Sequence, residues 1–471
     1  MTEKITRRGL VAGTAALAGA AALAGVTSMA IAEEATAEAT SSDWLGAAPE
    51  IDEASVVETL DCEILVVGGG QSGSPCASFA AMNGANVLWI EANENPVYMR
   101  SSAISGINTK YQQEVGVEIN PEDILNDVTH YALNQCSMKL WRDWVDHSAE
   151  VVEWFGGEVE KSGQRLMLEY TMPPEATRYK MWPTGHGTAT TDEFPDNPND
   201  PSPCAGNEGA VWEVIKADFE AAGGTYRNNT RMVCLIKDGD AVAGAYATNA
   251  EGEYVRINAS KGVVVATGGY VNNKEMYTAL QHGLEKSLSG NLNFGTAHGD
   301  GIKACLWAGA HMDHFPTTMI FDRGVVKPGY ELGGVFDGGE FSHFTFATQP
   351  FLKVNCYGKR ICNESSPYDF IVHAIWDSSW REDVQRFMTI GCSTLFAREG
   401  SNHHPEGLDG VESQMESMVE SGFIIKADTL EELAEGLGFD VDTFVAEVEK
   451  YNGWAADGYD GEFGKDPFRL S

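Results

Sequence analysis

A glycine-rich run, Gly68-Gly69-Gly70-Gln71-Ser72-Gly73, has the spacing G-x-G-x-x-G, which is typical of loops that bind the phosphates of a dinucleotide. Gly68 would allow a tight turn, Gly70 would let the backbone approach a pyrophosphate, and Gly73 would let a helix pack closely on a strand. Free backbone N–H groups at the start of that helix would bind the phosphate oxygens. The run therefore predicts that residues 68–73 form a pyrophosphate-binding loop.

A carboxylate follows this loop at a suitable distance. Glu91 stands 23 positions after Gly68, close to the roughly 20 positions expected for an acidic residue that binds ribose in such sites. Its oxygens could accept hydrogen bonds from the ribose hydroxyls. The alternative is that Glu91 is an ordinary surface carboxylate at the end of a strand.

The elements around the loop fit this interpretation. Residues 62–67 form a short apolar run that predicts a buried strand, and residues 86–90 predict a second strand that ends at Glu91. A helix-like stretch that ends near Gly84 lies between them. Strand, glycine turn, helix and strand make a βαβ unit, so the predicted fold class is α/β with a Rossmann-like domain.

Other segments divide the rest of the chain. Residues 121–156 have a helical pattern, residues 209–265 predict a helix followed by strands, and residues 428–455 predict a further helical stretch. Residues 171–206 contain seven prolines and are predicted to be a structureless lid or binding loop. Residues 33–59 are acidic and rich in Ala, Ser and Thr, which is typical of a flexible linker.

The 471-residue chain is strongly acidic, with 32 basic and 69 acidic residues and a formal net charge of −37. Such a chain should repel nucleic acids and anionic membrane surfaces, so we expect neither as a partner. The nine cysteines form no C-x-x-C pair, and therefore neither a zinc ribbon nor a haem-attachment motif is predicted.

The first 32 residues have the three parts of an export signal. Thr6-Arg7-Arg8-Gly9-Leu10 is a charged start of the twin-arginine type, an apolar run rich in Ala and Gly follows, and Ala30-Ile31-Ala32 resembles a cleavage site. The alternative is a membrane anchor, but the run is only weakly hydrophobic. We therefore expect cleavage near Glu33, no stable membrane span afterwards, and export to the periplasm or cell surface.

Several further motifs occur in the order that is found in one flavoprotein superfamily. They are Ser101-Ser102-Ala103-Ile104-Ser105-Gly106-Ile107-Asn108, Val263-Val264-Val265-Ala266-Thr267-Gly268-Gly269-Tyr270, Gly299-Asp300-Gly301, Gly358-Lys359-Arg360-Ile361-Cys362-Asn363-Glu364, Tyr451-Asn452, Gly458 and Phe463-Gly464-Lys465. With the glycine loop they resemble the fumarate reductase / succinate dehydrogenase flavoprotein superfamily, the FAD-dependent oxidoreductase 2 type. His298 stands where this family has a threonine.

The resemblance implies a Rossmann-like FAD-binding domain, residues 60–310, with an inserted α+β capping domain, residues 311–471. It implies an oxidoreductase acting on CH–CH groups, in which hydride moves between flavin N5 and a substrate carbon while a protein group handles the proton. FAD is expected to bind non-covalently. The residues that the resemblance and the glycine motif assign to FAD are Gly68, Gly70, Gln71, Ser72, Gly73, Glu91, Ser101, Ser102, Gly106, Ile107, Asn108, Ala266, Thr267, Gly268, Gly269, Gly299 and Asp300.

The sequence departs from the fumarate reductases at the residue that would handle the proton. Four positions after Glu364, where those enzymes have a catalytic arginine, this chain has Tyr368. A tyrosine offers a hydroxyl but no cation, which argues against a dicarboxylate substrate, and Tyr368 resembles the proton acceptor of the 3-oxosteroid Δ1-dehydrogenase branch. The alternative is that Tyr368 only packs in the cap. Arg360 is interpreted as structural, and His314 receives no role.

The resemblance also bears on partners and on the end of the chain. No haem motif and no motif for covalent FMN is present, so electrons are expected to pass to or from a separate carrier protein or a diffusible carrier. The family continues beyond the position of Ser471 into a further FAD-binding segment, which we expect to be missing here. Three hypotheses follow: an enzyme for an enone or ketosteroid-like substrate, a fumarate-reductase-like enzyme for unsaturated carboxylates, or an incomplete, non-catalytic fragment that needs a partner chain.

Overall fold

The computed structural model of the chain describes residues 44–96, 104–168, 180, 182–190, 206–281, 284, 288–291, 297–314, 320, 324–327, 336, 342–343, 351–378, 387–389 and 411–470. The predicted export signal, residues 1–32, lies outside the described residues, as does the first part of the predicted linker. In the described part of the chain, no helix has both the length and the apolar character needed to cross a bilayer.

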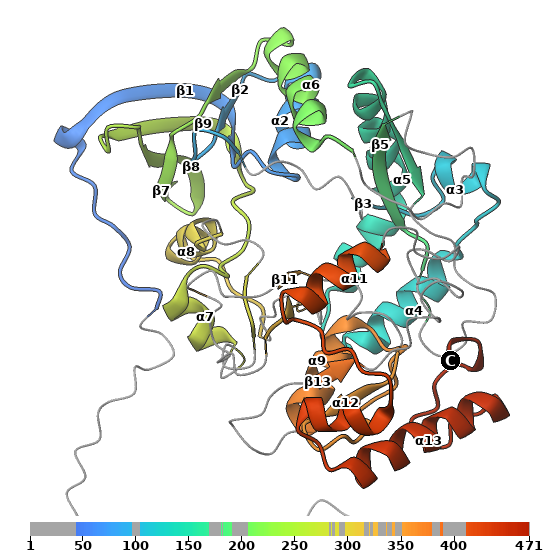
Figure 1. Ribbon diagram of the computed structural model, residues 1–471. Coiled ribbons are helices and arrows are strands. Elements are labelled where there is room, and N and C mark those ends of the chain that lie inside the picture. The colour runs from blue at the N-terminus through green and yellow to red at the C-terminus, as the bar shows by residue number, and fades with distance from the viewer. Residues whose placement is uncertain are drawn as a thin grey trace, which may run out of the picture. The chain divides into compact units, whose positions relative to one another are not determined.

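A six-stranded sheet has the strand order β6-β2-β1-β9-β8-β7 (Figure 1). The strands are β6 (Thr225–Arg227), β2 (Val87–Ile90), β1 (Val56–Val67), β9 (Tyr254–Val265), β8 (Ala241–Thr248) and β7 (Arg231–Asp238). The first four run parallel to their neighbours, and β7, β8 and β9 are joined by antiparallel pairs. The predicted α/β class, with a βαβ unit at residues 62–90, is confirmed.

Strand β1 is longer than its apolar run predicts. It begins at Val56, directly after the short helix η1 (Glu53–Ser55), and so includes residues assigned to the acidic linker. The reason is its pairing with β9, which extends from Val56 to Val67 and passes a register shift between Cys62 and Ile64. Pairing with a distant strand, rather than local hydrophobicity, sets where β1 starts.

Side chains alternate between the two faces of the sheet, as the pleat of a strand requires. One face packs against helices α2 (Gly73–Met82), α5 (Met138–Lys161) and α6 (Glu208–Ala221), of which α2 and α6 lie side by side in Figure 1. This core contains Val66, Val87, Trp89, Phe155, Trp212 and Phe219. The opposite face packs against α8 (Asp300–Trp307), with Leu65, Val67, Leu88, Ile90, Val255, Ile257 and Ala304 in its core.

A second, three-stranded sheet has the order β3-β5-β4, with β3 (Ile104–Ser105), β5 (Gly185–Thr190) and β4 (Gln164–Leu168). Strand β5 corrects the prediction that all of residues 171–206 lack structure, because it pairs with both neighbours. The predicted helix over 121–156 is two helices, α4 (Pro121–Tyr131) and α5. The helical conformation is interrupted between the two helices, where Leu133 and Asn134 have positive φ angles.

The C-terminal part has a core of its own. Strands β12 (Lys353–Asn355) and β13 (Phe387–Thr389) pair, and the helices are α9 (Tyr368–Ser378), α11 (Val411–Glu420), α12 (Leu430–Leu437), α13 (Val441–Asp457) and η5 (Pro467–Arg469). The helical stretch predicted at 428–455 is thus α12 and α13, separated at Gly438. The core contains Leu352, Val354, Phe439, Phe444, Val448, Tyr451 and Leu470. This part of the chain contains both helices and strands, and its assignment as a capping domain stays a prediction.

Four short elements complete the described structure: α3 (Lys110–Glu114), α7 (Lys274–Leu280), β10 (Gly324–Val325) and β11 (Ser342–His343). Strands β10 and β11 form an antiparallel pair.

Candidate functional site

The four parallel strands end at one edge of the large sheet, and the predicted nucleotide-binding residues follow three of them. The glycine loop follows β1, Glu91 follows β2, and residues 266–269 follow β9. Backbone hydrogen bonds tie these ends together, from Gly68 N–H to Ile90 O and from Ala266 N–H to Val67 O, both at 2.8 Å. Ligands of parallel α/β sheets bind outside the carboxyl ends of the strands. The fold therefore gathers these segments where a nucleotide would bind.

Two glycines of the loop are required by close contacts. Gly68 has φ +110°, and a Cβ there would lie 2.3 Å from Ala266 O. A Cβ on Gly73 would lie 1.9 Å from Gly68 O. Neither distance allows a side chain, so the first and last glycines of the motif let the loop pack tightly between β9 and the start of α2.

The loop directs its carbonyls into the protein and leaves its N–H groups available. Gly68 O and Gly69 O each accept an indole N–H at 2.9 Å, and Gly70 O accepts bonds from the backbone and hydroxyl of Ser74. In contrast, the backbone N–H groups of residues 70–73 donate to no other group within the described part of the chain. Free N–H groups at the start of the ten-residue helix α2 suit an anion. The loop therefore fits the pyrophosphate of FAD.

Glu91 is a buried carboxylate, 7% exposed, and not a free surface group. One oxygen accepts the backbone N–H of Gly69 at 2.7 Å, and the other accepts the backbone N–H and the side-chain amide of Asn93 at 2.9 and 3.1 Å. A carboxylate oxygen can accept more than one hydrogen bond, so these contacts leave capacity for a ribose hydroxyl. Glu91 thus holds the glycine loop, and its predicted contact with ribose stays a prediction.

The residues predicted between 101 and 108 occupy a tight turn against α5. A Cβ on Gly106 would lie 2.7 Å from Val152 Cγ2, and the Ile107 N–H donates to Ser148 Oγ at 3.2 Å. The Asn108 side chain exchanges two hydrogen bonds with the backbone of Ile119, at 2.8 and 2.9 Å. These contacts show how the turn is built. Ser101 and Ser102 lie outside the described residues.

A cavity of about 450 Å³ adjoins the segment that follows β9. Its lining includes Thr267 and Gly268, assigned to FAD above, together with Tyr270, Cys305, His311 and Asp313. The Gly299 N–H donates to Gly269 O at 2.9 Å, which joins the start of α8 to the same segment. Asp300 forms an ion pair with Arg231, Oδ2 to Nη2 at 2.6 Å. The predicted residues at 266–269 and 299–300 are thus neighbours in space.

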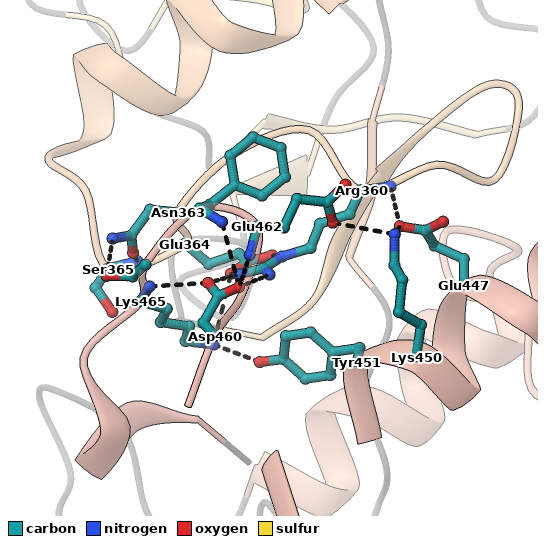
Figure 2. Close-up of polar contacts among 12 residues, drawn as sticks. Arg360, Asn363, Glu364, Ser365, Glu447, Lys450, Tyr451, Asp460, Glu462 and Lys465 are labelled. Carbon is teal, nitrogen blue, oxygen red and sulfur yellow. Dashed lines mark hydrogen bonds and ion pairs between the residues drawn. The ribbon is translucent and has the colours of Figure 1, made fainter. Parts of the chain in front are cut away.

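A cluster of buried charges joins residues 360–365 to residues 460–465 (Figure 2). The Arg360 guanidinium donates to both carboxylate oxygens of Glu364 at 2.8 Å and to both of Asp460 at 2.9 Å. All three side chains are fully buried. We call Arg360, Glu364, Asp460 and the adjacent Lys465 the Arg360 clamp. Its geometry supports the structural interpretation of Arg360.

Lys465 places a second buried cation in the clamp. Its Nζ lies 3.6 Å from Glu364 Oε2 and donates to the hydroxyl of Tyr451. Burial lowers the pKa of Lys465 to about 8. Burial alone would raise the pKa of Asp460, but hydrogen bonds from Arg360 and from backbone N–H groups outweigh it and hold that pKa well below its usual range. Opposite charges therefore compensate one another inside the clamp.

Tyr368 is the first residue of α9, four positions after Glu364 of the clamp. Its side chain lies outside the described part of the structure, and its catalytic role stays a prediction. The next residue, Asp369, accepts the Ile320 N–H at 3.0 Å, and burial raises the pKa of the Asp369 carboxyl. His314, which received no role, is exposed.

Sequence reasoning did not identify Trp89, Trp212 or Asp460. Trp89 lies in β2, two positions before Glu91, and this short separation from the acidic residue is a usable signal. Asp460 stands three positions before the Phe463-Gly464-Lys465 motif. Trp212 lies 143 positions after its partner Gly69, and no local pattern connects the two.

Comparisons with known proteins give consistent matches. A family model described as FAD binding domain matches residues 63–469. The chain is 24% identical to a vinyl phenol reductase of Lactiplantibacillus plantarum, over 86% of this chain and 79% of that protein. It is 27% identical to a 3-oxosteroid 1-dehydrogenase of Mycolicibacterium smegmatis, over 54% of this chain and 44% of that protein. The open conformation of a flavocytochrome c3 fumarate reductase superposes with a TM-score of 0.55 and 25% identity, over 88% of this chain and 64% of the other. The matches thus cover only part of the length of each of these relatives.

Proposed function

Because the chain belongs to the FAD binding domain family, with FAD as its cofactor, we propose that it is an oxidoreductase acting on a carbon–carbon bond next to a carbonyl. The substrate class is an enone or a ketosteroid-like molecule. FAD, when bound, supplies hydride transfer at flavin N5. The glycine loop would hold its pyrophosphate through backbone N–H groups, and Glu91 would accept from its ribose. The predicted non-covalent attachment can be checked by acid precipitation, which should release the flavin.

The observation that carries this proposal is a neutral tyrosine at the start of α9, directly after a clamped segment. The Arg360 clamp fixes the backbone at Glu364, and Tyr368 begins the helix four positions later. A phenol hydroxyl can exchange a proton with the carbon next to a carbonyl, and it does not require a carboxylate on the substrate. The Arg360 cation is fully buried and bonded to two carboxylates, so its charge is already compensated within the protein.

The named relatives support a neutral substrate. A vinyl phenol and a 3-oxosteroid, in the names of two of them, are molecules without a carboxylate. The flavocytochrome c3 relative is named a fumarate reductase, which keeps an unsaturated carboxylate as the second candidate.

We further propose that the protein is exported by the twin-arginine route to the periplasm or cell surface. There a separate carrier would exchange electrons with it, and the excess of acidic over basic residues in the chain favours a basic carrier.

The test is Tyr368→Phe in the full-length, FAD-loaded protein, assayed with fumarate, simple enones and 3-ketosteroids. Loss of the hydroxyl should lower turnover of an enone by roughly 10²–10⁴-fold, the usual contribution of a general acid or base, with FAD content unchanged. Tyr357→Phe is the matched control, because Tyr357 is an exposed tyrosine near the same segment.

Three results would overturn parts of the proposal. Efficient reduction of fumarate by the unmodified protein would contradict the substrate class. If Tyr368→Phe turned over the enone as fast as the wild type, Tyr368 would be a packing residue without a role in proton transfer. An FAD-loaded protein without turnover on any of these substrates would favour the incomplete, non-catalytic form that needs a partner chain.

A further inference from the structure

Two tryptophans outside the glycine motif bond directly to the glycine loop. Trp89 in β2 and Trp212 in α6 are 0% and 3% exposed. The Trp89 Nε1–H donates to Gly68 O at 2.9 Å, and the Trp212 Nε1–H donates to Gly69 O at 2.9 Å. An indole N–H is a donor only, and a buried donor must find an acceptor. Each indole therefore holds one loop carbonyl toward the protein interior.

A held carbonyl fixes the direction of the N–H that shares its peptide plane. In a trans peptide the C=O and the following N–H point in opposite directions. The carbonyl of Gly69 shares its plane with the N–H of Gly70, which has no acceptor in the described part of the chain. The carbonyl of Gly68 shares its plane with the N–H of Gly69, which donates to Glu91. Trp212 thus orients the Gly70 N–H, and Trp89 orients the N–H that holds Glu91.

The indoles are themselves fixed by other aromatic rings. The centroids of Trp89 and Trp212 lie 5.6 Å apart, and Tyr226 lies 4.8 Å from Trp89 and 5.7 Å from Trp212. Phe219 packs edge-on against Trp89 at 5.3 Å. Such a cluster leaves each ring little freedom to rotate, because interiors are closely packed. The two N–H groups are therefore rigid supports for the loop.

We propose that Trp89 and Trp212 are positioning residues for FAD. Trp212 holds the peptide plane at 69–70 so that the Gly70 N–H, and not a carbonyl oxygen, faces the pyrophosphate. Trp89 holds the plane at 68–69, whose N–H binds the carboxylate of Glu91. An inverted plane would present a carbonyl oxygen to a phosphate oxygen, and two acceptors repel each other. The inference rests on the FAD site of this family and does not depend on the substrate or on Tyr368.

The test is the affinity of the full-length apoprotein for FAD and for ADP, which carries the diphosphate without the flavin. Trp212→Phe keeps an aromatic ring and removes the N–H. We expect it to weaken both affinities by roughly three- to tenfold, the value of about one hydrogen bond. Trp89→Phe should also weaken FAD binding, through the plane that supports Glu91. Trp154→Phe is the matched control, because Trp154 packs on the same core without contacting the loop, and its affinities should stay within about twofold of the wild type.

A purely structural role predicts a different result. If both variants lowered the apoprotein melting temperature and left FAD and ADP affinities unchanged, the positioning proposal would be wrong. Equal weakening by Trp154→Phe would overturn it too. Should the variants fail to fold, wild-type protein with ¹⁵N-indole tryptophan provides the measurement: ADP should shift two slowly exchanging indole signals, and unmoved signals would contradict the proposal. Turnover is not measured, so failure of the proposed reaction would leave this result unaffected.

Discussion

The glycine loop and the Arg360 clamp fix the chain by opposite means. The loop uses small residues and backbone N–H groups, and a side chain added at Gly68 or Gly73 would overlap a carbonyl. The clamp uses large charged side chains that are fully buried and bonded to one another. A side chain is therefore excluded at the first and last glycines of the loop, whereas the clamp depends on keeping each of its charged side chains. The glycine loop leaves backbone N–H groups available for a ligand. In the Arg360 clamp, the charged side chains form hydrogen bonds and ion pairs with one another.

The largest expected effect is on the clamp. Arg360→Leu would leave Glu364 and Asp460 buried without the guanidinium that joins them. Removing one partner of a buried ion pair costs about 3–5 kcal/mol, since the remaining charge has lost its compensation. We expect a loss of this order in the free energy of unfolding of the full-length protein, measured with urea.

An exposed ion pair provides the control for this variant. Lys110 and Glu160 lie 3.8 Å apart with both side chains about half exposed, and Glu160→Gln should cost less than about 1 kcal/mol. Similar costs for the two variants would show that the clamp contributes no more than a surface pair, and the contrast between clamp and loop would fail.

The next effect tests the loop. Gly73→Ala would place a Cβ 1.9 Å from Gly68 O, so the loop must move. We expect a cost of roughly 1–3 kcal/mol in stability, as for other overpacked sites, together with at least a tenfold loss of FAD affinity measured by flavin fluorescence. Gly157→Ala in α5 is the control, because a Cβ there meets nothing within 4 Å. Unchanged FAD affinity in Gly73→Ala would contradict the assigned role of the loop.

A third effect concerns pH. Burial lowers the pKa of Lys465 to about 8 from its ordinary value of 10.5. Between these values the unfolded chain binds more protons than the folded one, so the contribution of Lys465 to stability rises with pH. Below about pH 8 the lysine is charged in both states, and this contribution no longer changes. The slope is at most about 1.4 kcal/mol per pH unit.

The measurement compares unfolding of the wild type and Lys465→Met from about pH 7 to 10.5, a range that spans both pKa values. The difference in stability between the two should change only above about pH 8, in favour of the wild type. Lys139→Met, at an exposed lysine, should give a curve parallel to the wild type. A constant difference between the wild type and Lys465→Met would show that Lys465 keeps an ordinary pKa when folded.

Local patterns in the sequence predicted the features that depend on neighbouring residues. The G-x-G-x-x-G spacing and the apolar run before Glu91 predicted the βαβ unit, because the turn, the helix start and the second strand lie within about 25 residues. Residues 121–156 keep one helical periodicity across both α4 and α5. The break between them depends on the positive φ angles of Leu133 and Asn134, which periodicity does not report.

Features that depend on distant partners could not be predicted in the same way. The start of β1 is set by pairing with β9, and β5 exists because β3 and β4 lie on either side of it. The bonds from Trp212 to Gly69 and from Arg360 to Asp460 join residues 143 and 100 positions apart. Composition and spacing describe each partner alone, and only the folded chain brings them together.

The parallel pairing of β1 with β9 has a consequence for synthesis of the protein. The Cys62 thiol in β1 donates a hydrogen bond to the backbone oxygen of Asn258 in β9, although 196 positions separate the two residues. At roughly 5–20 residues per second, the ribosome needs about 10–40 s to make the intervening chain. During that time β2 can pair with one edge of β1, but the other edge has no native partner. An apolar strand with one open edge is a site for aggregation, so the nascent chain should need chaperone protection until β9 emerges.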